Sequence, residues 1–321
     1  MAPERFYRLK SPDETSDYAQ AWVNGELKRP FGLPAIRCRR CAQTWTGWRV
    51  LPFALPRVLE MHPKLRDRSP LDDAEHAALR LEVKQAFASE GARIEPLAPG
   101  DSFVPSHWSI PTIPEDDFLW PDVTPIVSAK VRDALVAIKA TGIAFVPVVP
   151  SRIGGFSPRD APRVPASGEP EDLMTEAPIV EPNDPRTANY YEMVIAGESG
   201  APPGCVERAR CSACGRVEFN TSKRRFEMTA TMWRGHDVFY MATTRYIFVT
   251  ARVRDAIENA GATRFEVRPG SKLAEDLEQR AKDRRARIGA VRGRPPIGAA
   301  GRSPETPSEL ENDDEGDDGE S

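Results

Sequence analysis

The hydrophobic and polar positions predict a few short regular elements separated by proline-rich segments. Residues 72–89 contain neither glycine nor proline, and their apolar positions recur with the spacing of a surface helix. Residues 6–10 have the composition of a short strand, and residues 189–195 alternate like a half-buried strand. Apolar runs at 238–241 and 246–249 predict two more strands. The pattern therefore predicts a mixed α+β fold.

A nine-residue segment occurs twice, as Val127-Ser-Ala-Lys-Val-Arg-Asp-Ala-Leu135 and as Val249-Thr-Ala-Arg-Val-Arg-Asp-Ala-Ile257. Six of the nine positions are identical, and the other three are conservative replacements. Each copy has a helix-capping residue at its start and a glycine after it as a helix stop: Ser128 and Gly142, Thr250 and Gly261. Chance convergence of helix-start residues is the alternative. We expect two related strand–helix–strand units.

Proline content divides the chain. It has 31 prolines in 321 residues, nearly twice the usual share of about 5%. Eight of them lie in 150–185, which we expect to be a linker or insertion. The predicted organisation is an N-terminal half over 1–149, this linker, a C-terminal half over 186–270, and a charged, mostly disordered tail over 271–321.

Charge is segregated near the C-terminus. Residues 303–321 carry nine acidic side chains and no basic one, whereas residues 271–302 carry nine basic and four acidic ones. Since the formal charge of the chain is −4, residues 1–270 are balanced. A neutral body argues against binding to nucleic acid, because phosphate contacts normally need a basic face. The start of the chain has no apolar signal-peptide region, and no apolar stretch could span a bilayer. We expect a cytoplasmic protein without a membrane partner.

Two Cys-x-x-Cys pairs are the strongest chemical signal. A two-residue spacer lets a tight turn direct two thiolates at one cation, and two such knuckles complete a tetrahedral site. The sequence thus predicts one structural zinc ion that joins the two halves, held by Cys38, Cys41, Cys211 and Cys214. Unmetallated cysteines and redox chemistry remain alternatives.

Residues near the pairs refine this expectation. Gly215 supplies the positive φ that a knuckle turn often needs, whereas Ala42 at the same place in the first pair predicts a less regular knuckle. Trp45 and Trp48 are expected to pack over the site. Cys205 is expected to be a small buried apolar residue rather than a ligand.

No motif predicts an active site. The segment Gly197-Glu-Ser-Gly-Ala201 misses the nucleophile-elbow pattern at its last position, and no glycine-rich phosphate loop is present. The histidines have no metal-binding or catalytic spacing and are expected to be exposed or hydrogen-bonded: His62, His76, His107 and His236. We therefore do not expect an enzyme.

The order of several motifs resembles the double-CXXCG family of myxobacterial proteins. The matching pieces, within about residues 4–269, are Phe6-Tyr-Arg-Leu, Phe31-Gly-Leu-Pro-Ala-Ile-Arg-Cys-Arg-Arg-Cys41, Thr44-Trp45, Tyr190-Tyr-Glu, Arg210-Cys-Ser-Ala-Cys-Gly-Arg216, and the segment from Asp237-Val-Phe to Phe265-Glu-Val. The chain departs from the family pattern at Ala42, which replaces a glycine, and in the additions over 150–185 and 271–321.

The resemblance implies an immunity protein paired with a swarming-inhibition toxin. Its members are described as neutralising a toxin passed between sibling cells, so the implied partner is a cognate polypeptide toxin bound in the cytoplasm by stoichiometric occlusion. The competing expectation is a zinc-ribbon protein that binds nucleic acid or regulates expression, which the neutral body disfavours.

Overall fold

The computed structural model describes residues 5–12, 25–110, 114–122, 124–153, 187–220 and 227–274. The chain divides into two units, Met1–Asp276 and Leu277–Ser321, and every described residue lies in the first. The expected linker lies outside the described residues from 154 onward, and so does the expected tail from 275 onward.

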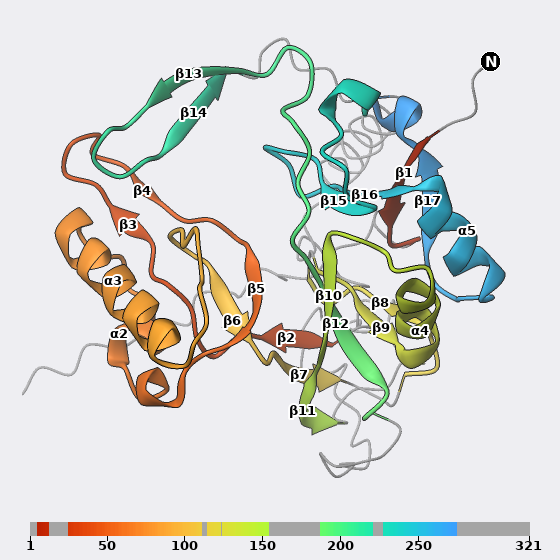
Figure 1. Ribbon diagram of the computed structural model, residues 1–321, viewed down its shortest axis with the longest axis horizontal. Helices are drawn as coiled ribbons and strands as arrows, with labels where there is room; N and C mark the ends of the chain where they lie inside the picture. Colours follow the sequence, from red (N-terminus) through yellow and green to blue (C-terminus); the bar gives the residue numbers. More distant parts are fainter. Residues whose placement is uncertain are drawn as a thin grey trace, which may run out of the picture. The chain divides into compact units, whose positions relative to one another are not determined.

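The first unit has the predicted mixed α+β architecture, with several small sheets and, within the described ranges, four α-helices (Figure 1). The helices are α2 (Pro63–Asp67), α3 (Asp73–Ser89), α4 (Ala129–Ala137) and α5 (Ala251–Asn259). Short 3-10 turns are η1 (Arg57–Leu59), η4 (Ala230–Met232) and η5 (Gly270–Lys272).

Two four-stranded sheets form one side of the fold. The first has the order β15-β16-β1-β17, with β1 (Phe6–Lys10), β15 (Val238–Tyr240), β16 (Ile247–Thr250) and β17 (Glu266–Pro269). The second has the order β10-β12-β9-β8, with β8 (Phe118–Leu119), β9 (Ile126–Ser128), β10 (Ile143–Pro147) and β12 (Tyr190–Ile195).

Smaller sheets complete the unit. One joins β2 (Glu26–Lys28), β7 (His107–Ile110) and β11 (Val149–Ile153). The two-stranded pairs are β3 (Ile36–Arg37) with β4 (Thr44–Trp45), β5 (Val50–Ala54) with β6 (Ser102–Val104), and β13 (Val206–Arg210) with β14 (Val217–Asn220). The expectation that 150–185 begins as a linker is wrong for its first residues. Residues 150–153 belong to strand β11, which pairs in parallel with β7.

Helix α3 confirms the helix expected over 72–89. Asp72 accepts the backbone N–H of Glu75, and the Glu75 carboxylate accepts the backbone N–H of Asp72, so both ends of a capping box are present. The buried face consists of His76, Leu79, Val83 and Phe87. This face belongs to an apolar cluster in the region from Leu33 to Phe103.

The repeated segments form two strand–helix–strand units with the same strand order. In each sheet, a strand from elsewhere in the chain lies between the strand before the helix and the strand after it. Strand β1 occupies this place beside α5, where Tyr7 lies opposite Pro269. Strand β12 occupies it beside α4, where Tyr191 lies opposite Pro147. Each unit therefore depends on a strand that is distant in sequence.

The two helices contact each other and share one apolar core. Arg132 of α4 lies 4.1 Å from the centroid of the Tyr191 ring, and Arg254 of α5 lies 4.2 Å from that of Tyr7. These matching cation–π contacts fix each helix against the central strand of its own sheet.

The helix ends differ from the sequence expectation. Ser128 and Thr250 do occupy the N-cap positions, but neither hydroxyl accepts a helix N–H. At the C-terminal end of α4, the left-handed residue is Lys139, with φ of 51°, rather than Gly142. Helix α5 has Gly261 at the corresponding place, with φ of 61°. The glycine stop is therefore confirmed for the second copy and wrong for the first.

Two aspartates connect the two strand–helix–strand units, each in the same way. Asp117, just before β8, accepts the hydroxyl of Ser128 at 2.6 Å and the backbone N–H of Thr263 at 3.0 Å. Asp237, just before β15, accepts the hydroxyl of Thr250 at 3.1 Å and the backbone N–H of Thr141 at 2.9 Å. Each carboxylate thus holds the start of one helix together with the loop that follows the other.

None of the helices described in the structure is long and apolar enough to span a membrane.

Candidate metal centre

Both Cys-x-x-Cys pairs lie in tight turns with the same hydrogen bond. The backbone N–H of Cys38 donates to the carbonyl of Gln43 at 2.9 Å, and that of Cys211 donates to the carbonyl of Arg216 at 2.9 Å. In each case the donor is the first cysteine and the acceptor lies five residues later. The two turns therefore share this bond, although a second one, from the N–H of Gly215 to the carbonyl of Cys211 at 2.9 Å, has no counterpart of normal geometry at Ala42.

Ala42 nevertheless adopts the backbone conformation expected of a glycine at this place. Ala42 has φ of 54°, and Gly215, at the same place in the second turn, has φ of 75°. Alanine adopts this left-handed conformation at a cost of about 1–2 kcal/mol. The turn is preserved, and the strain is confined to one exposed residue.

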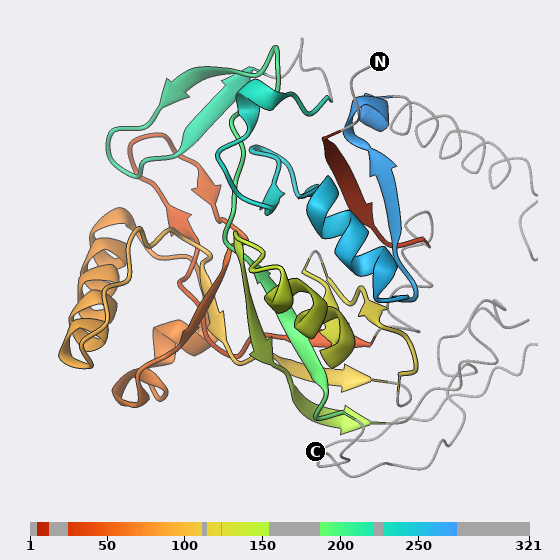
Figure 2. The same cartoon turned by 45° about the vertical axis from the view of Figure 1, so that its right-hand side comes forward.

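The elements that carry the two knuckles differ in how they are supported. The first lies between β3 and β4, and Arg39 ties it to the start of α3 through its backbone N–H to Asp73 and its guanidinium to Asp72. The second lies in the β13–β14 hairpin, and every residue of β13 is exposed. Figures 1 and 2 show this hairpin beside the β3–β4 turn. A two-stranded hairpin is marginally stable by itself.

The structure brings the four predicted cysteines together. Their Sγ atoms all lie within 4.8 Å of one another, although 173 positions separate the paired residues. Cys38 and Cys211 are 3.8 Å apart, and Cys41 and Cys214 are 3.9 Å apart. A tetrahedron with metal–sulfur bonds of about 2.3 Å has edges of about 3.8 Å. The cluster therefore fits one metal ion.

The surroundings of Cys211 favour its thiolate, whereas the pKa of Cys41 and that of Cys214 are raised in the metal-free cluster. Backbone N–H groups of Cys214 and Ala213 point to the Cys211 sulfur and lower the pKa of its thiol to about 6. The indole Nε1–H of Trp45 lies 3.3 Å from the Cys214 sulfur. Hydrogen bonds of this kind orient metal ligands and stabilise their charge. The sequence places Trp45 near the site but carries no signal for this donor role.

The fifth cysteine is not part of the cluster. Cys205 is half-buried, and its sulfur lies 3.8 Å from the Thr243 hydroxyl. It lies outside the cluster and is less buried than predicted. The ring of Trp48 packs edge-on against Tyr240, with centroids 4.4 Å apart.

His76 contradicts the expectation that each histidine is exposed or hydrogen-bonded. It is 0% exposed on the inner face of α3, and neither ring nitrogen forms a hydrogen bond of normal geometry with a described residue, although the carbonyl of Pro34 faces the ring. Burial, followed by the nearby charge of Arg80, lowers its pKa to about 4. His76 is therefore neutral at physiological pH.

No protein-family model matches the chain, and no curated protein sequence matches it.

Proposed function

We propose that Cys38, Cys41, Cys211 and Cys214 hold one structural zinc ion. Four thiolates at tetrahedral spacing are the ligand set that zinc prefers, and they leave no coordination position for a substrate. We further infer two repeated halves, each consisting of a knuckle and a strand–helix–strand unit. When bound, zinc supplies a cross-link between segments distant in sequence, and the protein residues supply the binding surface.

We propose that the protein is an immunity protein that binds a cognate polypeptide toxin in the cytoplasm and blocks it by occlusion. The observation that carries the proposal is the paired-knuckle cluster. The two motifs through which the sequence resembles the double-CXXCG family meet in one site of the kind those motifs imply. The rigid cross-link would preserve the shape of a surface that acts by complementarity rather than by chemistry.

Co-expression with the product of the adjacent gene tests the immunity function. We expect the full chain to restore growth of a host that produces this polypeptide, and the two chains to co-elute in a fixed ratio. A variant with all four cluster cysteines changed to serine should lose protection, and Cys205→Ser should retain it. Failure of the full chain to protect against the neighbouring product, together with no complex, would contradict the proposal.

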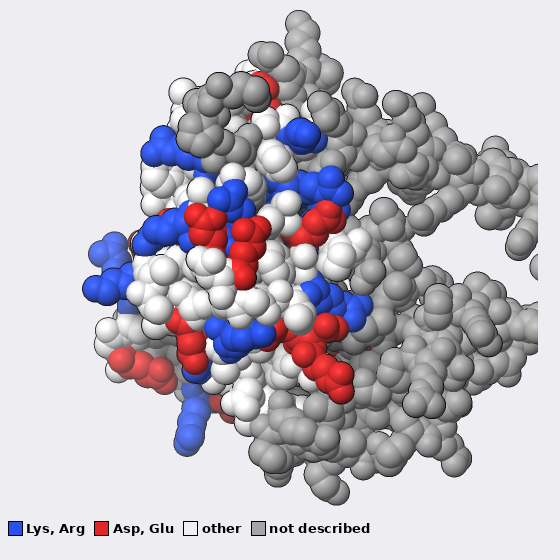
Figure 3. All heavy atoms as spheres, turned by 90° about the vertical axis from the view of Figure 1, so that its right-hand side faces the viewer, with Lys and Arg blue, Asp and Glu red and all other residues white. Residues whose placement is uncertain are grey.

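A zinc-ribbon protein that binds nucleic acid is the second candidate. A hollow of about 260 Å³ beside the cluster is lined by Arg40, Arg210 and Arg216. Arg210, however, is paired with Glu207 at 2.9 Å, and Glu218 lines the same hollow. On the face shown in Figure 3, basic and acidic side chains are interspersed rather than separated. Binding to duplex or single-stranded oligonucleotides at low salt would favour this candidate over the first.

A further inference from the structure

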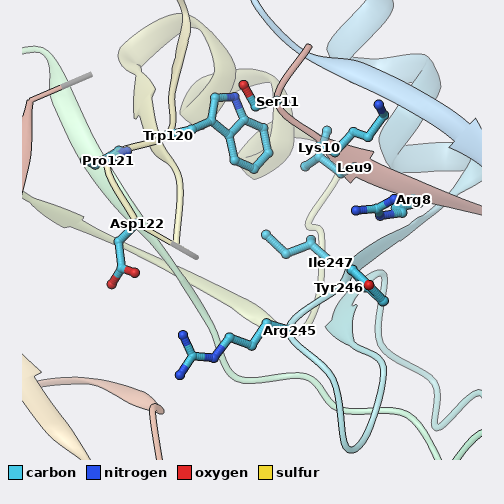
Figure 4. Close-up of a pocket in the computed structure, with 10 residues that line it drawn as sticks. All are labelled: Arg8, Leu9, Lys10, Ser11, Trp120, Pro121, Asp122, Arg245, Tyr246 and Ile247. Carbon is cyan, nitrogen blue, oxygen red and sulfur yellow. The ribbon is translucent and has the colours of Figure 1, made fainter. Parts of the chain in front are cut away.

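Two hollows, each of about 370 Å³, adjoin on the first unit. The first lies against β1 and the start of β16, and Figure 4 shows the side chains around it. The second lies toward the β3–β5 region. Asp122 and Arg245 line both hollows, so the two form one continuous depression. We call it the arginine groove and define it by Arg8, Arg29, Arg68, Asp122 and Arg245.

Basic side chains predominate in the arginine groove. Arg29 is neutralised within the fold, because its guanidinium contacts Glu192 at 2.6 Å and Asp122 at 2.8 Å. This pairing also occupies Asp122. Lys10, at the end of the first hollow, is paired with Glu266 at 2.7 Å. The acidic side chains of the groove are thus already engaged by basic partners.

Two arginines of the groove are not neutralised in this way. Within the described ranges, Arg68 and Arg245 form no ion pair with a carboxylate. Burial and the charge of Arg29 lower the pKa of Arg68, whose guanidinium donates to the carbonyl of Arg29 at 2.5 Å. Arg245 is exposed, and its guanidinium lies 5.6 Å from the centroid of the Trp48 ring. An anion bound beside Arg68 would offset the repulsion that Arg68 experiences from Arg29.

Aromatic rings line the groove beside the arginines. Trp120 is 5% exposed, and its indole N–H donates to the carbonyl of Arg264 at 3.2 Å. Tyr246 lies under Arg8, with 4.3 Å between the guanidinium carbon and the ring centroid. Trp48 is fixed by its contact with Tyr240. Arginine, tryptophan and tyrosine are the residues that most often carry the binding energy of protein–protein interfaces.

We infer that the arginine groove is the docking site for an acidic segment of a polypeptide partner, with carboxylates facing Arg68 and Arg245 and apolar side chains facing the aromatic rings. This inference rests on the proposed function and identifies the surface used. A polypeptide suits the groove better than a nucleic acid, because a continuous line of phosphates offers no hydrogen-bond donor to the exposed part of Asp122 at its centre. A polypeptide can place an N–H donor there instead.

The groove can be probed before a partner is known. The probe is a fluorescein-labelled heptapeptide, Glu-Asp-Glu-Phe-Glu-Asp-Glu, titrated into the full chain at low salt by fluorescence anisotropy. A peptide with glutamine and asparagine in place of the acids is the neutral control, and a labelled oligothymidine represents nucleic acid. The variants are Arg245→Gln, the double variant Arg68→Gln/Arg245→Gln, and Arg93→Gln as an exposed arginine outside the groove.

We expect the acidic peptide to bind, the neutral peptide not to bind, and added salt to weaken binding. The double variant should lose about tenfold in affinity, Arg245→Gln about threefold, and Arg93→Gln nothing, given the usual strength of partly exposed ion pairs. Thermal melts verify that each variant is folded, and Arg245→Gln keeps the test valid if the double variant is not. No peptide binding, equal binding by folded Arg245→Gln, or tighter binding of oligothymidine through the same arginines would overturn the inference.

The same variants separate this inference from the proposed function. Weaker affinity of the folded double variant for the neighbouring gene product supports the groove as its docking site. Unchanged affinity for that product overturns the groove assignment and leaves the immunity function standing. If the native chain neither binds nor protects, the immunity function fails, and the peptide titration alone decides whether the groove binds acidic polypeptides.

Discussion

Asp117 and Thr263, which are 146 positions apart, are joined by a hydrogen bond of 3.0 Å from the threonine N–H to the carboxylate. Asp237 makes the same bond with Thr141 at 2.9 Å. Both carboxylates are largely buried and also accept a helix-start hydroxyl.

Removal of either aspartate should destabilise the whole first unit. Asp117→Ala or Asp237→Ala leaves a backbone N–H, a hydroxyl and a partly exposed cation without their acceptor, so we expect each change to cost about 3 kcal/mol of unfolding free energy. Urea denaturation measures this cost. Asp133→Ala is the control, because Asp133 is 64% exposed and pairs with neighbouring Arg132; it should cost less than about 1 kcal/mol. Equal losses of unfolding free energy in all three variants would show that the reciprocal bonds do not contribute more stability than an exposed ion pair.

The left-handed alanine of the first knuckle predicts a stabilising substitution. Ala42→Gly removes the strain at φ of 54° and adds unfolded-state freedom, for a net gain of about 0.5–1 kcal/mol. Gly215→Ala is the reverse experiment and should lower the unfolding free energy by about 1 kcal/mol, because alanine is strained at φ of 75°. No described atom lies near enough to the new methyl group to offset this strain by a contact. Thermal melts of the metal-loaded protein check both signs. A destabilised Ala42→Gly variant would contradict the observed turn.

Metal removal should act first on the β13–β14 hairpin. Its exposed strand β13 and its marginal intrinsic stability mean that the ligands at Cys211 and Cys214 are its main anchor. A strong chelator, or Cys211→Ser, should raise hydrogen exchange over 206–220 before it rises in α4 and α5. Cys205→Ser should leave the exchange pattern unchanged. Full protection of the hairpin in metal-free protein would refute the structural role of the metal.

His76 predicts a loss of stability in mild acid. Its pKa is about 4 in the folded protein and about 6.5 in an unfolded chain, so the unfolded state binds the additional proton between these values. Stability therefore decreases as the pH is lowered from about 6.5 to 4, by up to about 3 kcal/mol. Arg80 and the carbonyl of Pro34 are the groups that face the ring.

The variant His76→Leu, whose side chain is apolar and does not titrate, should remove this part of the pH dependence. Denaturant midpoints for both proteins, measured across the window, isolate the histidine because all acidic residues are common to both. Parallel stability curves would mean that His76 does not titrate as its burial implies.

The sequence predicts well what is encoded locally. The helix at α3 is marked by Asp72 and Glu75 at its start, and the repeated segments locate α4 and α5 because each carries its own helix signals. The cysteine spacing likewise identifies four residues that the fold brings together. In each case, the residues that carry the signal are the residues that form the structure.

Features that depend on distant neighbours are not predictable in this way. Nothing local at β1 indicates that it pairs with β16 and β17, more than 200 positions away. The burial of His76 depends on how α3 packs. Lys139 adopts the left-handed conformation although the corresponding residue of the second copy, Gly261, is the glycine that this conformation favours. The arginine groove combines residues from five segments, none of which forms a motif by itself.

The central place of β1 in its sheet imposes an order on biosynthesis. Ribosomes synthesise Phe6–Lys10 before the other strands of its sheet, and the strands on either side of it end at Thr250 and Pro269. At about 5–20 residues per second, the strand waits about 10–50 s for its neighbours. During that interval the apolar side chains of Phe6 and Leu9, which are 2% exposed in the folded protein, have no sheet to enter. The nascent chain therefore carries an exposed apolar strand throughout that interval, and this first sheet is completed only when nearly the whole folded unit has emerged.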